Sequence, residues 1–318
     1  MSLPAVAKLG IVLWAVPLTG QVRITQDIDR VKVVIDGKPY TDFVYGADVT
    51  KPYLHPLRSA TGVIVTRAFP VEKRGSGSTD HAEHRDLWFS HSNVNGDNFY
   101  ANEKTFTTLN RGAIAVRKID RIRSGKRWGA ISATLGWVDH EGREILRERR
   151  EMVFYSGSAQ RVMDFSFALT ALVPVKFGDH RDGMFSIRVT DALQEAHTGD
   201  MTSAEGCRKE KGCWGKRSKW MDYSGEVEGE KLGIAIFDHP GNPRHPAYWH
   251  SRGYGLFASN IFGVNEFTRN PAVDSSLTLA PRETLRFRYR LLIHPGDARD
   301  AELERQYADY VKSSLSRR

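Results

Sequence analysis

Alternation of apolar and polar residues recurs along the chain from Val22 to His294 and constrains its fold more than any other feature. In residues 285–291 (LRFRYRL), arginines alternate with apolar side chains, as in a strand with one buried and one solvent-facing side. Residues 31–40 (VKVVIDGKPY) carry a similar pattern around Asp36-Gly37, a dipeptide typical of a hairpin turn. Further strands are predicted at residues 113–122, 128–138, 144–154, 161–169, 184–189 and 232–237.

A strong helical pattern occurs only near the C-terminus. Between residues 297 and 315, apolar side chains recur at helical spacing, with acids early and Lys312 late, as the helix dipole prefers. The chain has 318 residues, of which 40% are hydrophobic, so it can bury a large core. It shows no fixed-period repeat and no long linker that would divide it. We therefore expect an all-β fold, a large antiparallel β-sandwich with a C-terminal helix, as a single domain over residues 21–318. Residues 70–101 and 197–223 interrupt the strand pattern and predict long loops, which are usually functional.

The first twenty residues predict an export signal. Residues 9–19 (LGIVLWAVPLT) form an apolar stretch of signal-peptide length, and Gly20 precedes the polar Gln21. A buried first strand or a short amphipathic helix are the alternative interpretations. Cleavage after residue 20 would place the protein in the periplasm or outside the cell. The chain contains no other apolar run, and this one is too short to span a bilayer, so no membrane span is predicted.

The two cysteines, Cys207 and Cys213, lie close together in a Gly- and Lys-rich segment. In an oxidising compartment such a pair most simply forms a disulfide bond. Their spacing differs from the CxxC redox motif. We therefore predict a disulfide that closes one loop.

The formal net charge is +8, and basic residues cluster at 117–127, 143–150 and 208–219. These clusters mostly alternate with apolar residues, as the solvent faces of strands would, and no nucleic-acid-binding module accompanies them. We therefore predict no nucleic acid partner. Attraction to an anionic polysaccharide or membrane surface stays open, because a basic field acts on any polyanion.

Residues able to carry chemistry are concentrated in a few segments. Residues 80–91 (DHAEHRDLWFSH) contain three histidines, three carboxylates, an arginine and a tryptophan. Residues 238–250 (DHPGNPRHPAYWH) follow an apolar strand, and residues 214–223 (WGKRSKWMDY) form a third group. Residues 51–58 and 179–183 have similar character. We expect the stretches around positions 80 and 240 to meet and line one hollow at an end of the sheets.

Together these residue types suit carbohydrates. Sugars stack their C–H faces on aromatic rings, their hydroxyls need fixed polar partners, and acid/base steps need a carboxyl or imidazole group. The predicted function is a carbohydrate-active enzyme, a hydrolase, lyase or epimerase, although sequence spacing does not define the reaction. The candidate acid/base residues are His84, Asp80, His239 and Asp238. The candidate substrate-binding residues are Arg85, Trp88, His91, Asn242, Arg244, His245, Trp249, Lys216 and Trp220.

Other interpretations of these residues stay open. The tryptophans are as readily core residues, and the aspartates can cap turns or pair with nearby arginines. A glycan-binding module without catalysis would use the same aromatic and polar groups. No organic cofactor is predicted. A divalent metal is the third alternative, held by His81, His84 and His91 with Asp80 or Glu83. The sequence has no Gly-rich phosphate loop and no GxSxG motif, which argues against nucleotide-dependent enzymes and serine hydrolases.

Four motifs resemble an uncharacterised family of secreted bacterial proteins, domain of unknown function 6807, often labelled methane oxygenase PmoA. They are KPYLHPLR at 51–58, DHAEHRDLWFSH at 80–91, WGKRSKWMDYSG at 214–225 and GIAIFDHPGNPRHPAYWHSRGYGLFASNIFG at 233–263. Similar members commonly carry a proline–histidine pair and a glycine where this chain has Ala82, Glu83 and Asp86. One imidazole is thus missing here, which weakens a metal site carried over from the family.

The resemblance implies a sandwich protein associated with bacterial sugar and polysaccharide use, with no established reaction. It does not imply methane oxidation, since the membrane methane monooxygenase subunit is a bundle of spanning helices and this chain lacks such segments. By analogy at the level of the fold, mutarotase-like supersandwiches are comparable proteins.

Overall fold

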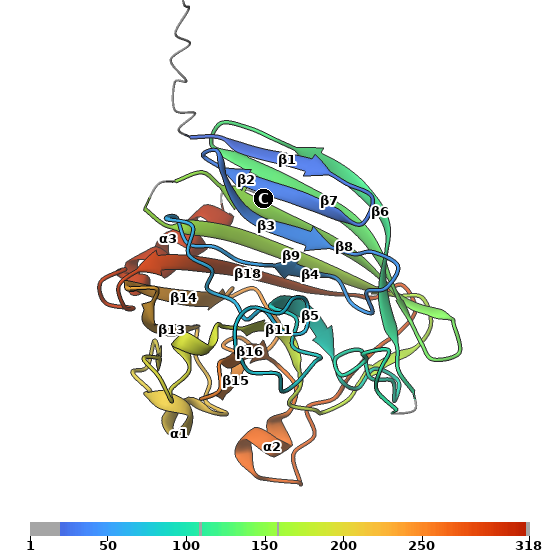
Figure 1. Ribbon diagram of the computed structural model, residues 1–318. Coiled ribbons are helices and arrows are strands. Elements are labelled where there is room, and N and C mark those ends of the chain that lie inside the picture. Colours follow the sequence, from blue (N-terminus) through green and yellow to red (C-terminus); the bar gives the residue numbers. More distant parts are fainter. Residues whose placement is uncertain (1–19, 108–109, 158, 316–318) are drawn as a thin grey trace, which may run out of the picture.

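The computed structural model describes residues 20–107, 110–157 and 159–315. The predicted signal peptide at 1–20 therefore lies almost entirely outside the described residues. Two eight-stranded antiparallel sheets pack against each other (Figure 1). Sheet A has the order β1 (Val22–Gln26), β2 (Arg30–Ile35), β3 (Lys38–Val44), β4 (Tyr53–His55), β5 (Leu87–His91), β11 (Gly183–Arg188), β16 (Leu256–Asn260) and β15 (Tyr248–Arg252).

Sheet B is the longer-stranded layer. Its order is β12 (Asp200–Ser203), β13 (Trp220–Val227), β14 (Glu230–Asp238), β18 (Thr284–Pro295), β9 (Arg161–Ala171), β8 (Glu144–Tyr155), β7 (Trp128–Val138) and β6 (Ala113–Arg123). A small third sheet pairs β10 (Val175–Phe177) with β17 (Leu277–Leu279). The predicted antiparallel β-sandwich is confirmed.

The main core lies between the two sheets. In β9 every second side chain is buried, and Phe165 and Phe167 point toward Phe89 and Phe185 of sheet A. Stacking between Phe89 and Phe167, with ring centroids 3.9 Å apart, joins the layers directly. The buried apolar cluster accordingly contains residues of both sheets.

The helices lie outside the sandwich. Helix α3 (Leu303–Leu315) packs on the outer face of sheet B, where Leu303 and Tyr310 contact a cluster that includes Trp220, Phe237 and Leu292. The short helices α1 (Lys209–Cys213) and α2 (Val264–Thr268) lie near β15, away from β1–β3 (Figure 1). A short 3₁₀ turn covers Asp191–Leu193. Within the described part of the chain, no helix is both long and apolar enough to cross a membrane.

The predicted strands agree with the structure within a few residues at each end. The turn at Asp36-Gly37 joins β2 and β3, and both residues have positive φ angles, 54° and 77°. The predicted helix at 297–315 begins six residues later, because the Asp297 carboxylate accepts hydrogen bonds from the backbone of Arg299 and Asp300 and forms a turn. The disulfide between Cys207 and Cys213 is confirmed.

Both segments predicted as long loops contain regular structure, which corrects that expectation. Residues 70–101 include β5, and residues 197–223 include β12, α1 and the start of β13. All five residues of β5 are buried, so no alternation marks it as a strand.

Candidate functional site

The outer face of sheet A, turned away from the core, gathers the polar residues of the segment at 80–91. Strand register aligns Tyr53, Trp88, Ser186, Ala258 and His250 in one row across β4, β5, β11, β16 and β15. The two central side chains are small and the flanking ones are large. Only 1% of Trp88 and 4% of His250 are exposed, which shows that neighbouring segments cover this row.

Two buried arginines hold residues 80–84 over this face. Arg67 donates hydrogen bonds to the Asp80 carboxylate (2.6 Å) and to the carbonyl oxygen of His81 (2.9 Å). Arg188, at the end of β11, donates to the same carboxylate (2.8 Å). Burial tends to raise the pKa of Asp80, but Arg188 and Arg67 outweigh it and hold this pKa below its ordinary value. Asp80 is therefore an ionised clamp between two guanidinium groups.

His84 is a neutral imidazole whose tautomer is set by Arg188. Nη1 of Arg188 lies 3.1 Å from Nδ1 of His84. A guanidinium group can only donate, so Nδ1 accepts and Nε2 carries the proton. Burial, reinforced by Arg188 and His81, lowers the pKa of His84 well below 6.5. Nε2 faces the Glu83 carboxylate at 3.7 Å, and on that side His84 presents an N–H donor.

Aromatic rings enclose this imidazole. His84 stacks on Trp88 and on His81, with ring centroids 5.4 Å and 4.7 Å apart, and Tyr100 meets its edge at 5.8 Å. Tyr254 stacks on His81 at 5.1 Å and continues the group of rings toward solvent, where His81 is exposed. Ring faces and polar groups thus occur side by side.

Residues 100–103 cover another side of the cluster, and Lys51 anchors them. The fully buried Nζ of Lys51 donates to the carbonyl oxygen of Tyr100 (2.7 Å) and to Oδ1 of Asn102 (3.0 Å). Burial lowers the pKa of Lys51 to about 8, although Glu103 opposes this effect. Arg85 binds both carboxylate oxygens of Glu103, at 2.9 Å and 2.6 Å. The position of the Tyr100 ring therefore depends on these charged groups.

Asp182 and His250 form a second pair of titratable groups at this face. Nδ1 of His250 lies 3.5 Å from Oδ1 of Asp182. Burial raises the pKa of Asp182, with His180 and Arg181 opposing, and burial lowers the pKa of His250 to about 3. Asp182 also helps burial to raise the pKa of Tyr100, which places this carboxyl in the same electrostatic environment as the His84 cluster.

Two buried polar atoms of this face, Nε1 of Trp88 and the hydroxyl oxygen of Ser90, have no hydrogen-bond partner among the described residues. The Tyr100 hydroxyl interacts with the Ser186 hydroxyl, and Nδ1 of His250 faces the Asp182 carboxyl at 3.5 Å. A buried donor or acceptor without a partner costs about 1 to 3 kcal/mol. Unpartnered groups are therefore concentrated beside the aromatic rings and the neutral histidines.

One group of side chains could hold a metal ion by proximity. His81, Glu83 and His84 each offer a ligand atom, and these atoms lie within 4.8 Å of one another. Metal coordination needs a lone pair on an imidazole nitrogen, and the noncoordinating N–H usually donates to an acceptor. In His84 the lone pair of Nδ1 is directed at the Arg188 guanidinium and Nε2 is protonated. This arrangement does not fit a metal ligand.

The structure distributes the candidates from residues 80–91 over both faces of sheet A. Asp80, His84, Arg85 and Trp88 lie at the outer face, as described above. His91 lies on the core side of β5, where Nε2 donates to the carbonyl oxygen of Gly178 (2.8 Å) and the ring contacts Phe262. Because strand neighbours alternate between faces, His91 cannot join His81 and His84 in one ligand set.

The candidates from residues 238–245 are not brought to His84. The fully buried Asp238 carboxylate accepts hydrogen bonds from Asn242 Nδ2 (2.7 Å), His245 Nδ1 (2.8 Å) and the backbone nitrogen of Ala247 (2.9 Å). His239 packs its ring edge-on against Tyr310 of α3. These residues organise the connection between β14 and β15.

Two further candidates of this stretch also have structural surroundings. Arg244 donates to backbone carbonyl oxygens, including those of Ile261 (3.1 Å) and Ser276 (3.2 Å). Trp249 is fully buried in the main core and donates to the carbonyl oxygen of Ser218 (2.9 Å). The side chains of Arg244 and Trp249 are both engaged within the protein, and the end of the stretch, at Tyr248 and His250, reaches the outer face of sheet A.

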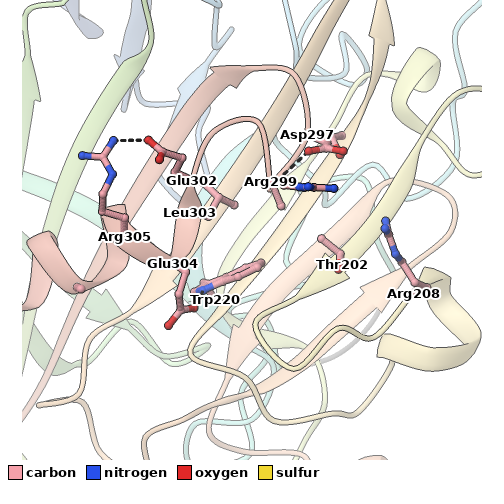
Figure 2. Close-up of a pocket in the computed structure, with 12 residues that line it drawn as sticks. Thr202, Arg208, Trp220, Asp297, Arg299, Glu302, Leu303, Glu304 and Arg305 are labelled. Atoms are coloured by element: carbon pink, nitrogen blue, oxygen red, sulfur yellow. Dashed lines mark hydrogen bonds and ion pairs between the residues drawn. The ribbon is translucent and has the colours of Figure 1, made fainter.

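Lys216 and Trp220 lie elsewhere. Lys216 is exposed in the segment before β13. Trp220 lines a hollow of about 720 Å³ between sheet B and the segment that leads into α3, where Nε1 donates to Glu304 (3.1 Å). Figure 2 shows Trp220 beside Glu304, with Arg299 and Arg208 farther along the hollow. This hollow is separate from the outer face of sheet A.

Sequence reasoning assigned no catalytic or substrate-binding role to Arg188, Tyr100, Asp182, His250 or Tyr254. A weak signal existed for Asp182, which belongs to the polar segment at 179–183, and for His250, which ends the segment at 238–250. Arg188 ends a fully buried strand in which Ser186 is the other polar residue, and a buried arginine signals a special partner. Tyr100 and Tyr254 carried no signal.

Solved structures with similar architecture include sugar-handling proteins. The GH36 alpha-galactosidase AgaB from Geobacillus stearothermophilus is 10% identical with a TM-score of 0.43, over 86% of this chain and 41% of that chain. The related AgaA in complex with raffinose is 11% identical with a TM-score of 0.40, over 87% of this chain and 41% of that chain. A galactose mutarotase-like protein from Clostridium acetobutylicum is 9% identical with a TM-score of 0.37, over 86% of this chain and 99% of that chain.

This chain therefore spans about two fifths of the length of the alpha-galactosidases. Likenesses at this level of identity and TM-score carry no information about its reaction. A comparison with curated proteins found no match. The model of one family, described as a family of unknown function (DUF6807), matches residues 30–308.

Proposed function

The chain belongs to DUF6807, a family of unknown function, and we propose that it is an exported enzyme that performs acid/base chemistry on a sugar. The proposed site is the outer face of sheet A, around His84 and Asp182. The reaction classes that fit are hydrolysis, elimination and epimerisation, which share proton transfer to and from substrate oxygen or carbon atoms.

The unpartnered polar atoms beside aromatic rings are the observation that carries this proposal. Within the part of the chain that the structure describes, Nε1 of Trp88 and the hydroxyl of Ser90 are buried without a hydrogen-bond partner. Sugar hydroxyls donate and accept hydrogen bonds, while the C–H faces of the ring pack on aromatic side chains. A sugar bound here would supply hydrogen-bond partners to these atoms and a C–H face to the rings beside them.

The titratable groups divide into a proton donor and a proton acceptor. Burial raises the pKa of Asp182, so this carboxyl keeps its proton to higher pH and serves as the general acid. Burial tends to raise the pKa of Glu83, but the hydrogen bond from His81, a backbone hydrogen bond and the charges of His81 and Lys51 together outweigh it and lower this pKa, so Glu83 serves as the ionised base. The neutral His84 donates its Nε2 proton as a hydrogen bond and orients the substrate oxygen between them.

Export fits the covalent structure. The Cys207–Cys213 disulfide belongs to an oxidising compartment. The apolar stretch at 9–19 matches a signal peptide. A periplasmic or extracellular enzyme would meet free sugars and polysaccharide fragments there.

Product detection on a panel of glycosides, oxidised sugars and free sugars tests the proposal. We expect turnover of at least one sugar, and a fall in kcat of about 100-fold or more in Asp182→Asn and in His84→Asn. Asp309→Asn and His197→Asn are matched controls, because both residues are exposed and lie outside the site. The controls should retain the activity of the wild type.

Three other outcomes of this experiment would lead to a different function or a different site. Sugar binding by calorimetry without turnover of any panel member would make the protein a glycan-binding module. A stoichiometric metal in the purified protein, with activity lost to a chelator, would replace the proposed acid/base site by a metal centre. Turnover unaffected by both site variants would place the reaction elsewhere on the molecule.

A further inference from the structure

Two exposed arginines flank a smaller side chain on the outer face of sheet B, and we call the strip of surface along β9 between them the furrow. Strand register places Arg149 of β8, Ala168 of β9 and Arg286 of β18 in one row. Both arginines are exposed, and the side chain between them is small. Two strand spacings separate their backbones, about 10 Å. An anionic group above Ala168 can therefore contact both guanidinium groups.

The furrow continues along β9 in both directions. Its floor consists of Ser166, Ala168 and Thr170, which are all partly exposed. Arg147 borders it beside Thr170, and Arg288 borders it beside Ser166. Residues on one face of a strand repeat about every 7 Å. The surface is thus a strip with a hydroxyl-bearing floor that is basic on both sides at Ala168 and on one side at Ser166 and at Thr170.

The positive charges of Arg149 and Arg286 in this row are not neutralised by nearby acidic residues that the structure describes. Glu144 pairs with Arg147 at 2.9 Å, and Asp164 pairs with Arg290 at 2.6 Å, toward opposite ends of the furrow. Glu151 stands one row from Arg149, on the same strand face. In the described ranges, no carboxylate lies within the 4.0 Å ion-pair distance of Arg149 or Arg286. Arg149 and Arg286 carry like charges on one sheet face, which does not stabilise the sheet.

We propose that this furrow binds an extended anionic polysaccharide, carrying carboxylate or sulfate groups, separately from the site on sheet A. Its central pair, Arg149 and Arg286, matches one anionic group of such a chain, and Ser166 and Thr170 can bind sugar hydroxyls on either side of that group. The floor carries no aromatic side chain on which nucleic acid bases could stack. It carries no large apolar side chain to insert into a membrane. Helix α3 limits the furrow at the end near Val162 and Leu292.

Binding of the full-length mature chain to defined polymers tests this proposal. The probes are polygalacturonate, dextran sulfate and neutral dextran, in calorimetry or affinity electrophoresis at about 100 mM salt. We expect salt-sensitive binding to at least one anionic polymer and none to neutral dextran. The double variant Arg149→Gln/Arg286→Gln should weaken that binding about tenfold or more. Comparing the two anionic polymers distinguishes carboxylate from sulfate recognition.

A charge-matched control separates the furrow from the general basic field of the protein. Arg23→Gln/Lys38→Gln removes the same charge from exposed positions of sheet A and should weaken binding less than about threefold. Equal weakening in both double variants would overturn the proposal, as would tighter binding to duplex DNA or anionic lipid vesicles. Arg149→Lys/Arg286→Lys keeps the charges and should bind between the wild type and the glutamine variant. Turnover at the sheet A site should be the same in all of these variants.

Discussion

At the scale of the residue, buried polar groups of this protein either have all their hydrogen bonds within the chain or lack a partner. Asp238 is fully buried, and both of its carboxylate oxygens accept hydrogen bonds from Asn242, His245 and Ala247. Trp88 and Ser90 are also buried, and each holds a polar atom that has no hydrogen-bond partner among the described residues. The first kind organises the backbone, because its hydrogen bonds are complete within the chain. The second kind is the better candidate for ligand binding.

Replacing Asp238 tests this distinction. Asp238→Ala leaves Nδ1 of His245 and the N–H of Ala247 without an acceptor, while the Asn242 amide keeps its bond to the carbonyl oxygen of Arg288. We therefore expect the free energy of unfolding to fall by about 2 to 4 kcal/mol. Urea denaturation measures this loss. The exposed Asp309→Ala should change the same quantity by less than about 0.5 kcal/mol. If Asp238→Ala instead kept its stability and abolished turnover, Asp238 would belong to the active site.

At the scale of the element, alternation identifies strands only where one face meets solvent. In sheet B, β8 and β9 alternate buried and more exposed side chains, and both are evident in the sequence. In sheet A, β5, β11 and β16 are buried on both faces because loops cover the outer face. A strand buried on both sides has no alternation. The strands that carry the proposed site are therefore the hardest to find from sequence.

Helix α3 stabilises sheet B through a small apolar contact. Leu303 is 1% exposed and packs with Trp220 and Phe237. We expect Leu303→Ala to lower the free energy of unfolding by about 2 to 5 kcal/mol, since it leaves a cavity under the helix. Lys312→Ala, on an exposed position of α3, is the control in the same urea measurement. A loss below about 1 kcal/mol would mean that α3 does not depend on this contact.

The disulfide should contribute moderately to stability. It closes a loop over a sequence separation of 6, for which chain entropy predicts about 2.4 kcal/mol. We therefore expect Cys207→Ala/Cys213→Ala to lower the free energy of unfolding by about 2.4 kcal/mol, measured by urea denaturation. A reducing agent should destabilise the wild type in the same way and leave the double variant unchanged. An unchanged wild type under reducing conditions would contradict this account.

At the scale of the whole molecule, buried neutral histidines make stability depend on pH. Burial lowers the pKa of His84 well below its ordinary value and that of His91 and His250 to about 3. The unfolded chain binds these protons near pH 6.5 and the folded chain does not, so each histidine lowers stability as the pH falls below 6.5. The raised pKa values of Asp86 and Asp182 act in the opposite direction over acidic pH.

His91→Gln isolates one of these contributions. Between pH 6 and pH 4 we expect the unfolding free energy of the variant to fall less steeply than that of the wild type, by about 1.4 kcal/mol per pH unit. Urea denaturation at several pH values measures both slopes. His197→Gln should keep the slope of the wild type, because His197 is exposed. Equal slopes for His91→Gln and the wild type would show that His91 binds a proton in the folded state.

The sequence by itself determined the class of fold, most strands of sheet B, the turn at Asp36-Gly37 and the disulfide. These features depend on local periodicity, turn chemistry or short separations along the chain. Only the tertiary structure decided which polar segments meet. Arg188 sets the tautomer of His84 across a separation of 104 residues, and His91 is turned away from His84 by the pleat of β5. Sheet pairing and loop packing create such contacts, and no spacing in the sequence encodes them.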